Sequence, residues 1–289
     1  MFATINGMGR FTFEDFKTKY PDDNACLDRV FKARFGREKY CHKCGAETKW
    51  YRVKKRQSYA CMHCGYQLFP LSNTIFRKTT TPLWSWFYAI YLVSVAKNGI
   101  SAKELERHLN VSYPTAWRML KQIRLLMNQD GAKLFGVVEA DETYIGGRRT
   151  QAHSYDNKVP VVGIAEKRGK LKAKVIDGAS AYTVMPYLRA NIEQGAVLHT
   201  DKSKIYINAN RDFKHLSVDH SPGHYAENGV HTNNLEGFWS LFKRSIRGTY
   251  TSVSPKYLDL YVSEFVFRHN HRFEPVCPVL LARAVKPVR

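Results

Sequence analysis

The stretch His231-Thr-Asn-Asn-Leu-Glu-Gly-Phe-Trp-Ser-Leu-Phe-Lys-Arg-Ser-Ile-Arg247 predicts a helix with two unlike faces. Its apolar residues recur at the helical period and form one stripe: Leu235, Phe238, Phe242 and Ile246, with Trp239 at the margin. The polar residues fall on the opposite side: Glu236, Ser240, Lys243 and Arg247. Glu236 and Lys243 are separated by roughly two turns, or about 10 Å along the axis, so a carboxylate and a cation face the same way.

Glu236 admits two interpretations. It fits a capping pair in which Asn233 is the N-cap and Glu236 is the third helical residue. It also fits a catalytic acid, because two aspartates upstream end strand-like runs: Asp141 closes FGVVEAD, and Asp201 closes AVLHTD. These two runs favour the second interpretation. Glu139 shares the strand face of Asp141. It admits two interpretations, an acid that supports the catalytic carboxylates or an exposed edge position, and we expect the edge position.

Composition indicates a soluble protein with a polyanionic partner. The chain has 289 residues, 44% of them hydrophobic, which is enough for two or three domains with sizeable cores. Its 45 Lys and Arg residues against 25 acidic residues give a net charge of +20, which favours a nucleic acid as the partner. Both halves are basic, with +12 over residues 1–130 and +8 over residues 131–289.

Neither a membrane segment nor a secretory signal is expected. The first residues lack the charged region and the apolar core of a signal peptide. The longest apolar run, residues 83–96, is shorter than the roughly 18 to 20 residues that a membrane span requires, and it predicts a buried helix. We therefore expect a cytoplasmic protein with no membrane partner, associated with the nucleoid when it is bound to DNA.

Two paired-cysteine motifs predict one structural Zn²⁺ site. They lie 16 residues apart, the spacing of a four-thiolate zinc ribbon: Cys41, Cys44, Cys61 and Cys64. A glycine follows each motif, and residues 50–53 and 58–60 are expected to form two strands. Disulfide bonds are the alternative, which a cytoplasmic location disfavours. Cys26 and Cys277 are expected to be buried thiols.

The front half contains two candidate DNA-binding features. A basic turn is expected at the tip of the ribbon, where it would contact phosphate: Lys54, Lys55 and Arg56. Residues 99–124 predict a helix-turn-helix, with a capping box from Ser101 to Glu104 and a turn at 110–112. The side chains left to face a groove are those of Tyr113, Thr115, Arg118 and either Lys121 or Gln122. A solvated turn and a plain helical hairpin are the respective alternatives.

From residue 134 the pattern changes to strands. We expect strands at 134–145, 159–165 and 171–177, a helix near 181–193, a strand at 196–200, a short helix near 203–208, a strand near 213–218 and a helix from about Asn234. This order predicts an RNase H-like mixed sheet with flanking helices, in which Asp141 lies on the first strand and Asp201 ends the fourth, at the edge where ligands bind. Residues 219–232 are expected to form a loop over the site. A last helix should begin with Ser254 as its N-cap.

The chain is therefore expected to contain four segments. They are an N-terminal helical segment at 1–38, a zinc ribbon at 39–72, a helix-turn-helix region at 80–130 and an RNase H-like catalytic domain at 131–289.

Three carboxylates on such a fold suit phosphodiester chemistry. Two Mg²⁺ or Mn²⁺ ions about 4 Å apart can serve both the attacking and the leaving oxygen. Hard cations take oxygen ligands, which Asp141, Asp201 and Glu236 would supply. Lys243 on the same helix face would neutralise a substrate phosphate.

A family resemblance rests on three motifs: VEADETYIGG at 138–147, HTD at 199–201 and HTNNLEGFWSLFK at 231–243. The chain closely resembles bacterial insertion-sequence transposases of the zinc-ribbon DDE type over nearly its whole length. The resemblance implies that Asp141, Asp201 and Glu236 form the acidic triad and that Lys243 is the basic residue seven places after the glutamate. Some members of the group have Asn as the third residue of the triad, whereas this chain has Glu.

A DNA transposase is therefore the expected function. The front half would bind the terminal inverted repeats, and the RNase H-like domain would cleave the ends and join the 3′-hydroxyls to target DNA. A homodimer or higher oligomer on DNA is expected. Two alternatives are a domesticated or inactive copy that serves as a DNA-binding regulator, and a related nuclease that cleaves without strand transfer.

Overall fold

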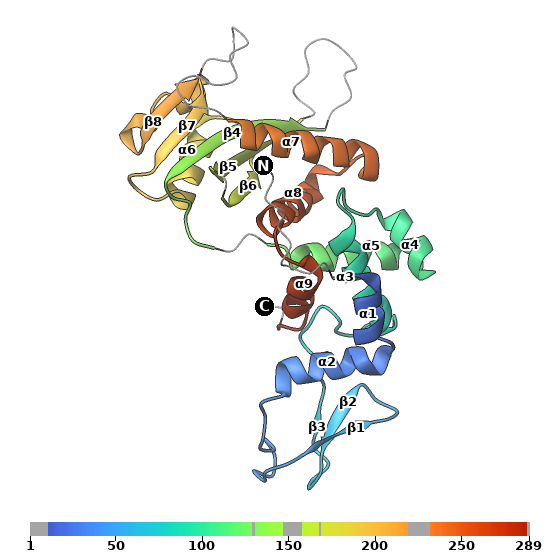
Figure 1. Ribbon diagram of the computed structural model, residues 1–289. Helices are drawn as coiled ribbons and strands as arrows, with labels where there is room; N and C mark the ends of the chain where they lie inside the picture. The colour runs from blue at the N-terminus through green and yellow to red at the C-terminus, as the bar shows by residue number, and fades with distance from the viewer. Residues whose placement is uncertain (1–10, 129–130, 147–157, 168, 219–231, 288–289) are drawn as a thin grey trace, which may run out of the picture. The chain divides into compact units, whose positions relative to one another are not determined.

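The computed structural model describes residues 11–128, 131–146, 158–167, 169–218 and 232–287 (Figure 1). The chain divides into two compact units, one formed by residues up to Leu126 together with the segment from Phe273 onward, and the other by Met127–Arg272. The catalytic domain is expected to run to residue 289, whereas in the structure the segment from Phe273 onward groups by its contacts with the N-terminal residues.

The segment after Arg272 forms a helix that the sequence analysis did not predict, α9 (Val276–Ala284). It packs against α3 (Leu83–Val95) in the first unit. Arg283 Nη1 donates a hydrogen bond of 2.7 Å to the backbone oxygen of Leu126. The C-terminal segment therefore completes the core of the N-terminal unit.

The first unit begins with two helices, α1 (Phe13–Lys19) and α2 (Asp23–Phe35), within the segment expected to be helical. The apolar run after Pro82 forms α3, and Trp86, Phe87 and Ile90 in it are fully buried, as predicted. Among the described residues, we find no helix that combines the length and the apolar character needed to cross a membrane.

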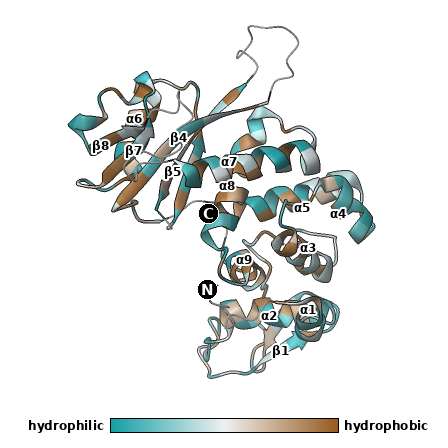
Figure 2. Ribbon diagram, turned by 45° about the horizontal axis from the view of Figure 1, so that its top comes forward, coloured by the Kyte–Doolittle hydropathy of each residue, from teal (hydrophilic) through white to brown (hydrophobic). Residues whose placement is uncertain are grey.

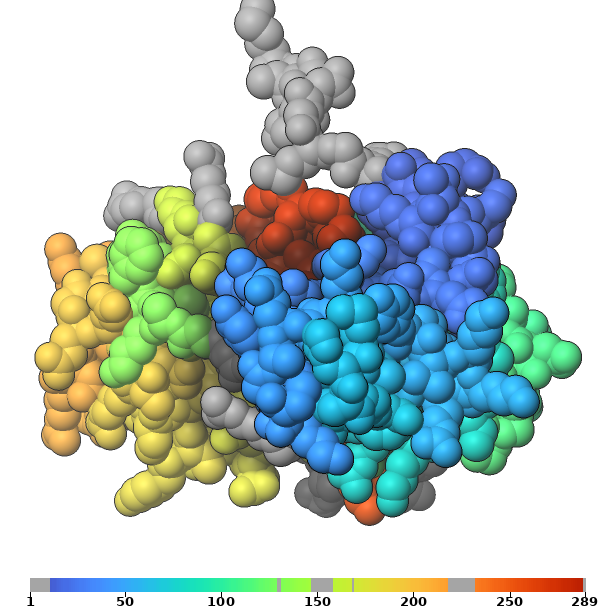
Figure 3. Space-filling view, turned by 90° about the horizontal axis from the view of Figure 1, so that it is seen from below, coloured from blue at the N-terminus to red at the C-terminus, as the bar shows by residue number. Residues whose placement is uncertain are grey.

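The ribbon is a small antiparallel sheet in the order β1 (Trp50–Val53), β2 (Ser58–Cys61), β3 (Gln67–Leu68). The two expected strands are confirmed, and β3 is added. The ribbon packs on α2: the rings of Phe31 and Tyr59 stack with centroids 3.8 Å apart, and the Tyr59 hydroxyl donates to Asp28. In the space-filling view the segments coloured blue to cyan, which include α2 and the ribbon, form one contiguous surface (Figure 3).

Two helices joined by a short turn follow α3: α4 (Ala102–Leu109) and α5 (Tyr113–Leu125). The Ser101 hydroxyl accepts a hydrogen bond from the Glu104 backbone N–H, as expected of the N-cap. Asn110 ends α4 in the left-handed conformation at φ 50°, which asparagine tolerates better than most residues. The predicted pair of helices and its turn are therefore present.

The second unit is built on a five-stranded mixed sheet in the order β6-β5-β4-β7-β8. The strands are β4 (Val137–Ile145), β5 (Val159–Glu166), β6 (Leu171–Val175), β7 (Val197–Asp201) and β8 (Lys214–Val218). The first three pair antiparallel, whereas β4 with β7 and β7 with β8 pair parallel. The RNase H-like mixed sheet is confirmed.

Helices cover both faces of this sheet. On one face α6 (Ala181–Asn191) packs over Val138 and Ala140 of β4. On the other face α7 (Asn233–Ser245) and α8 (Pro255–Asn270) pack over a core that includes Ile145. Since side chains alternate along a strand, Glu139 and Asp141 face α7. Figure 2 shows hydrophilic and hydrophobic residues interspersed along α7, consistent with one buried and one exposed face.

Shorter helices complete the second unit. Two 3₁₀ turns, Lys204–Tyr206 and Ala209–Arg211, stand where one short helix was expected. A π-helical turn, Ile246–Tyr250, continues α7. α8 covers the edge strand β6, because the side-chain amide of Asn270 bonds both the N–H and the carbonyl of Leu171 at 2.8 Å. This contact protects an edge that would otherwise offer unpaired backbone groups.

Candidate active site and metal centre

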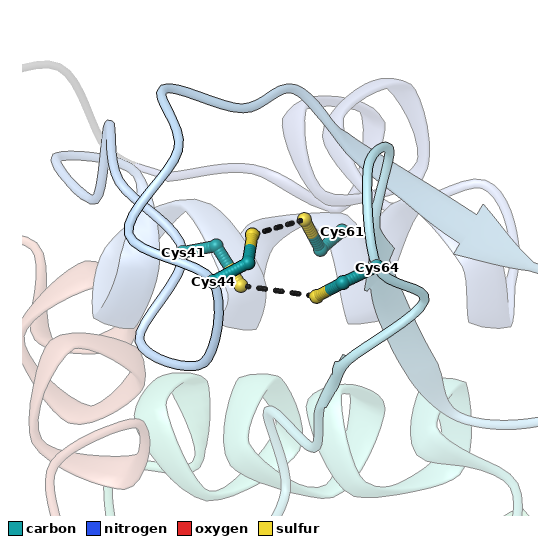
Figure 4. Close-up of side chains that lie close together, drawn as sticks. All are labelled: Cys41, Cys44, Cys61 and Cys64. Carbon is teal, nitrogen blue, oxygen red and sulfur yellow. Dashed lines mark hydrogen bonds between the residues drawn. The ribbon is translucent and has the colours of Figure 1, made fainter.

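The four cysteine sulfurs of the ribbon converge, with all Sγ atoms within 4.8 Å of one another (Figure 4). The Cys41 and Cys64 sulfurs are 3.6 Å apart, and those of Cys44 and Cys61 are 3.9 Å apart. Tetrahedral Zn²⁺ with Zn–S bonds of about 2.3 Å places its sulfurs about 3.8 Å apart, so the cluster has the size of a zinc site. A disulfide needs about 2.0 Å, and all four cysteines are free thiols.

Backbone geometry around the sulfurs also suits a zinc ribbon. Gly45 and Gly65 have φ of 69° and 70°, and each permits the tight turn after its cysteine pair. The Lys43 and His63 amides point at the sulfurs of Cys41 and Cys61 at 3.4 Å. Such amide bonds stabilise thiolates, the form that binds Zn²⁺.

The Cys61 thiol has a pKa below the usual value of a cysteine, so it ionises more readily. Burial raises its pKa, but hydrogen bonds, first from the Thr48 hydroxyl at 3.3 Å and then from backbone amides, outweigh that effect and lower the pKa of Cys61 to about 6. His42 and His63 have other partners: the Nε2 atoms lie 3.2 Å from a Glu38 carboxylate oxygen and 2.9 Å from the Glu47 carbonyl. The donor set at the cluster is therefore the four cysteines.

Loss of the ribbon's metal is expected to unfold the ribbon, because so short a segment has little apolar core of its own. Elemental analysis of reduced, freshly purified protein should give about one Zn²⁺ per chain, and Cys61→Ser should lower that ratio sharply. Cys26→Ser is the matched control, since Cys26 is buried in α2 outside the cluster. A zinc content near zero in the unaltered protein would refute the site.

Asp141 and Asp201 lie on neighbouring parallel strands. Glu139 on β4 and His199 on β7 are the last paired residues of the two strands, and continuing this register by two residues sets Asp141 level with Asp201. The negative charge of Asp201 also helps to raise the pKa of Asp141, so the two carboxylates are near each other. β7 ends at Asp201, whereas β4 continues along β5 to Ile145. Both carboxylates thus stand at the carboxyl end of β7, where sheets of this class bind ligands.

Asp141 is held in place by α7 and β5. Trp239 Nε1 donates a hydrogen bond of 3.0 Å to Asp141 Oδ2. Gly163, which lies opposite Asp141 on β5, leaves room for the Trp239 ring: a Cβ at Gly163 would lie 2.6 Å from Trp239 Cζ2. Trp239 is only 4% exposed, so it lies inside the core together with the rest of the apolar stripe.

The carboxyl group of Asp141 is in an environment that disfavours its charge. Burial raises the pKa of Asp141 to about 7, and the charges of Glu142 and Asp201 act in the same direction. Burial also raises the pKa of Glu142, which accepts a 2.6 Å hydrogen bond from the buried hydroxyl of Tyr206. The negative charges of neighbouring carboxylates repel one another, and a divalent cation bound between them would relieve this repulsion. The carboxylates around Asp141 therefore fit a hard cation.

Glu236 lies on the exposed face of α7, as predicted. The N-cap is Thr232, so Asn233 is not the cap and Glu236 is the fourth helical residue, not the third. The Thr232 hydroxyl donates to Glu236 Oε1 at 3.1 Å. The predicted cap residue is therefore wrong by one position, although Glu236 does contact the true cap residue.

Lys243 lies two turns after Glu236 and is half-buried. Burial lowers the pKa of the Lys243 ammonium, and the negative charge of Asp141 acts against that shift. Lys243 and Asp141 therefore share one electrostatic environment. The apolar stripe of α7 is buried as predicted: Leu235, Phe238, Phe242 and Ile246.

The three carboxylates of the predicted triad do not form a compact group of ligands. In the described part of the chain, the cysteines are the only group of three or more His, Cys, Asp or Glu residues that are placed to hold one metal ion together. The structure brings Asp141 and Asp201 level and places Glu236 on the helix that packs on the same face. The loop predicted at 219–232 falls, except for Thr232, outside the described residues.

Four residues around Asp141 were missed or misjudged by sequence analysis. Glu139 was expected at an exposed edge, but β4 is the central strand and Glu139 is 1% exposed. Gly163, Tyr206 and Trp239 were given no role. The strand alternation indicated that Glu139 shares a face with Asp141, but the other contacts join residues far apart in sequence and depend on the sheet's register.

The candidate DNA-binding residues of the first unit lie at the surface. Lys54, Lys55 and Arg56 are exposed in the turn between β1 and β2. On α5, Tyr113 and Arg118 are exposed, whereas Thr115 is half-buried and its hydroxyl lies 3.0 Å from that of Ser112. The Arg118 guanidinium lies 6.0 Å from the ring centre of Trp86 on α3.

Comparisons with known proteins match both parts of the chain. Residues 133–270 match the model of the ISXO2-like transposase domain, and residues 21–67 match that of the transposase zinc-ribbon domain. An uncharacterized protein in transposable element ISH50 of Halobacterium salinarum is 26% identical over 257 residues, which cover 80% of this chain and 85% of that protein. An uncharacterized transposase-like protein of Haemophilus influenzae is 25% identical over 103 residues, which cover 35% of this chain and 82% of that protein. The chain thus combines a transposase zinc-ribbon domain with an ISXO2-like transposase domain.

Proposed function

We propose that this transposase binds the terminal inverted repeats of an insertion sequence, cleaves its ends and joins the 3′-hydroxyls to target DNA. The observation that carries the proposal is the pair of aspartates, Asp141 and Asp201, level at the carboxyl end of β7 beneath α7. Glu236 and Lys243 on α7 supply a third carboxylate and a cation. This arrangement suits phosphodiester chemistry, in which charge develops on phosphate and leaving oxygens.

Each residue of the site has a distinct task in this proposal. Asp141, Asp201 and Glu236 would hold Mg²⁺ or Mn²⁺, which when bound activates the attacking oxygen and stabilises the leaving oxygen. Trp239 fixes one oxygen of Asp141, so the other is directed to the site. Lys243 would bind a phosphate of the DNA end, and Lys243→Ala should slow joining through poorer positioning without removing a metal ligand.

A joining assay distinguishes this proposal from its alternatives. A labelled DNA end that carries the inverted repeat is incubated with plasmid and Mg²⁺, and the joined product is measured. Joined product supports a transposase. Cleavage without joining would indicate a nuclease, and binding without either would indicate a DNA-binding regulator.

The front unit is proposed to bind DNA through the basic turn of the ribbon, which would contact phosphates, and through α5, which would contact bases. Replacing Lys54, Lys55 and Arg56 together with Ala should weaken binding to all sequences and reduce the salt slope by about 2.7, since each lost phosphate contact contributes about 0.9. Arg118→Ala should instead reduce the preference for the inverted repeat over random duplex, by about 1 to 3 kcal/mol. Binding titrations at several salt concentrations with both duplexes measure these effects.

The matched control for the ribbon tip keeps its charge: Lys54→Arg, Lys55→Arg and Arg56→Lys together should bind nearly as the unaltered protein does. The helix-turn-helix assignment fails if Arg118→Ala leaves the ratio of the two affinities unchanged.

A further inference from the structure

Glu139 is a buried carboxylate with a specific pair of donors. Its side chain is 1% exposed on the central strand β4. Its Oε1 accepts a hydrogen bond of 2.7 Å from Asn234 Nδ2, and its Oε2 accepts one of 3.1 Å from the Asn234 backbone N–H. Burying a carboxylate is costly unless hydrogen bonds satisfy it, so this pair of bonds is structurally consequential.

The donors lie at the first turn of α7. Asn234 is the second helical residue, and its N–H is one of those that the first turn leaves without an intrahelical acceptor. The N-cap Thr232 directs its hydroxyl to Glu236. Glu139 on β4 therefore accepts the hydrogen bond from this N–H, as the side chain of an N-cap residue would otherwise do. The negative charge of Glu139 is also favourable at the positive end of the helix dipole.

The contact joins the two elements that carry the proposed catalytic carboxylates. Glu139 is two residues before Asp141 on β4, and Asn234 is two residues before Glu236 on α7. A contact at this point determines where α7 begins along the strand. A slip of one residue would move Glu236 about 1.5 Å along the helix axis and turn it by about 100°.

We propose that Glu139 and Asn234 are positioning residues that set Glu236 relative to Asp141; this inference rests on the proposed function. Neither residue touches the reacting phosphate. They act by fixing the start of α7 on the strand that carries Asp141, and a misplacement of about 1 Å at such a site can cost on the order of 100-fold in rate.

The proposal is tested in the full-length protein by exchanging the carboxylate of Glu139 and the amide of Asn234 between the two positions. In Glu139→Gln, the side-chain oxygen can still accept one hydrogen bond, but the new side-chain NH₂ group faces the NH₂ group of Asn234, and two donors cannot bond each other. In Asn234→Asp, the new carboxylate faces the carboxylate of Glu139. Each single change should reduce the kcat of joining by about 10- to 100-fold. In the combined variant Glu139→Gln/Asn234→Asp, the amide can donate to the new carboxylate while its oxygen accepts the N–H of residue 234. Its kcat should recover to within about threefold of the unaltered protein.

Two further readouts separate positioning from folding. The DNA concentration at half-maximal rate should stay within about twofold, because the ribbon and helix-turn-helix are untouched. Mn²⁺ titration of the protein without DNA should show weaker binding for each single variant and recovery in the combined one. Glu264→Gln is the matched control: Glu264 is equally buried and bonds Arg268 at 2.7 Å on α8, so its loss should lower Tm while kcat is preserved well below Tm.

The outcomes are distinct. If the combined variant is no more active than the weaker single variant, or if Glu139→Gln joins ends normally while Asp141→Asn does not, the positioning role is wrong and the proposed function stands. If Asp141→Asn itself joins ends normally, the proposed function has failed.

Discussion

Asp141→Asn is expected to reduce end cleavage and joining by about 10³-fold or more, a loss of roughly 4 kcal/mol of transition-state stabilisation. Asparagine keeps the shape of the side chain and an oxygen that Trp239 Nε1 can still reach. It removes the negative charge that a hard cation requires. Asp201→Asn and Glu236→Gln should have the same effect, because each removes one carboxylate from the same proposed set.

Asp141→Asn should raise, not lower, the stability of the protein when no Mg²⁺ or Mn²⁺ is present and the ribbon keeps its Zn²⁺. The pKa of Asp141 is raised to about 7 in the folded state, so its ionised form opposes folding, and stability is lost as pH rises from the unfolded value of 3.8 towards 7. Asp141→Asn removes this penalty. With no Mg²⁺ or Mn²⁺ added and the ribbon's Zn²⁺ retained, its Tm should therefore exceed that of the unaltered protein at pH 8, and the difference should vanish near pH 4.

Thermal unfolding of both proteins at the two pH values, with joining assays alongside, measures these effects. A purely structural Asp141 would give the opposite pattern, a lower Tm at pH 8 with joining retained.

Gly163→Ala should lower both stability and activity. An added methyl group in a strand would ordinarily gain about 0.5 to 1 kcal/mol from reduced backbone entropy in the unfolded chain. At this position, however, the Cβ would lie 2.6 Å from Trp239 Cζ2 and 3.0 Å from Leu235 Cδ2, both buried. Overpacking of this kind costs about 1 to 3 kcal/mol, so the steric effect should outweigh the gain.

In Gly163→Ala the joining rate should fall together with the stability, because the displaced Trp239 ring can no longer donate its hydrogen bond to Asp141. Gly237→Ala is the matched control: it lies within α7 with no atom within 4 Å of an added Cβ, and it should stabilise the helix by up to about 1 kcal/mol. Tm and joining rate are measured for both variants. A Gly163→Ala protein as stable and as active as the unaltered one would contradict the packing of Trp239 against β5.

Sequence periodicity was sufficient for the elements that carry the acidic residues. The strand-like run that contains Asp141 predicted a strand at 134–145, where β4 spans Val137–Ile145, and the apolar stripe of α7 predicted which of its faces is buried. The end of β7 at Asp201 was also predicted, because charged and turn-forming residues follow a short apolar run. Each of these inferences depends only on neighbouring residues.

Contacts between distant segments could not be predicted in this way. Alternation placed Glu139 on the face of Asp141 but could not show that β4 is central, which depends on β7 returning beside it. The hydrogen bond from Trp239 to Asp141 requires the register that brings Gly163 opposite Asp141. The membership of α9 in the first unit depends on packing against α3, which no local pattern reveals.

Strand transfer by Glu236→Gln tests the central claim most directly, because this substitution separates the two roles open to Glu236. Glutamine can still accept the hydrogen bond that Thr232 donates to Glu236 Oε1, so a helix that only needs this contact should keep its stability. A metal ligand, in contrast, loses its charge. The measurement is joining of a pre-cut inverted-repeat end to plasmid DNA with Mg²⁺, with Tm and DNA affinity determined on the same preparation. We predict unchanged folding and DNA binding with joining reduced by about 10³-fold, whereas near-normal joining would contradict the acidic triad.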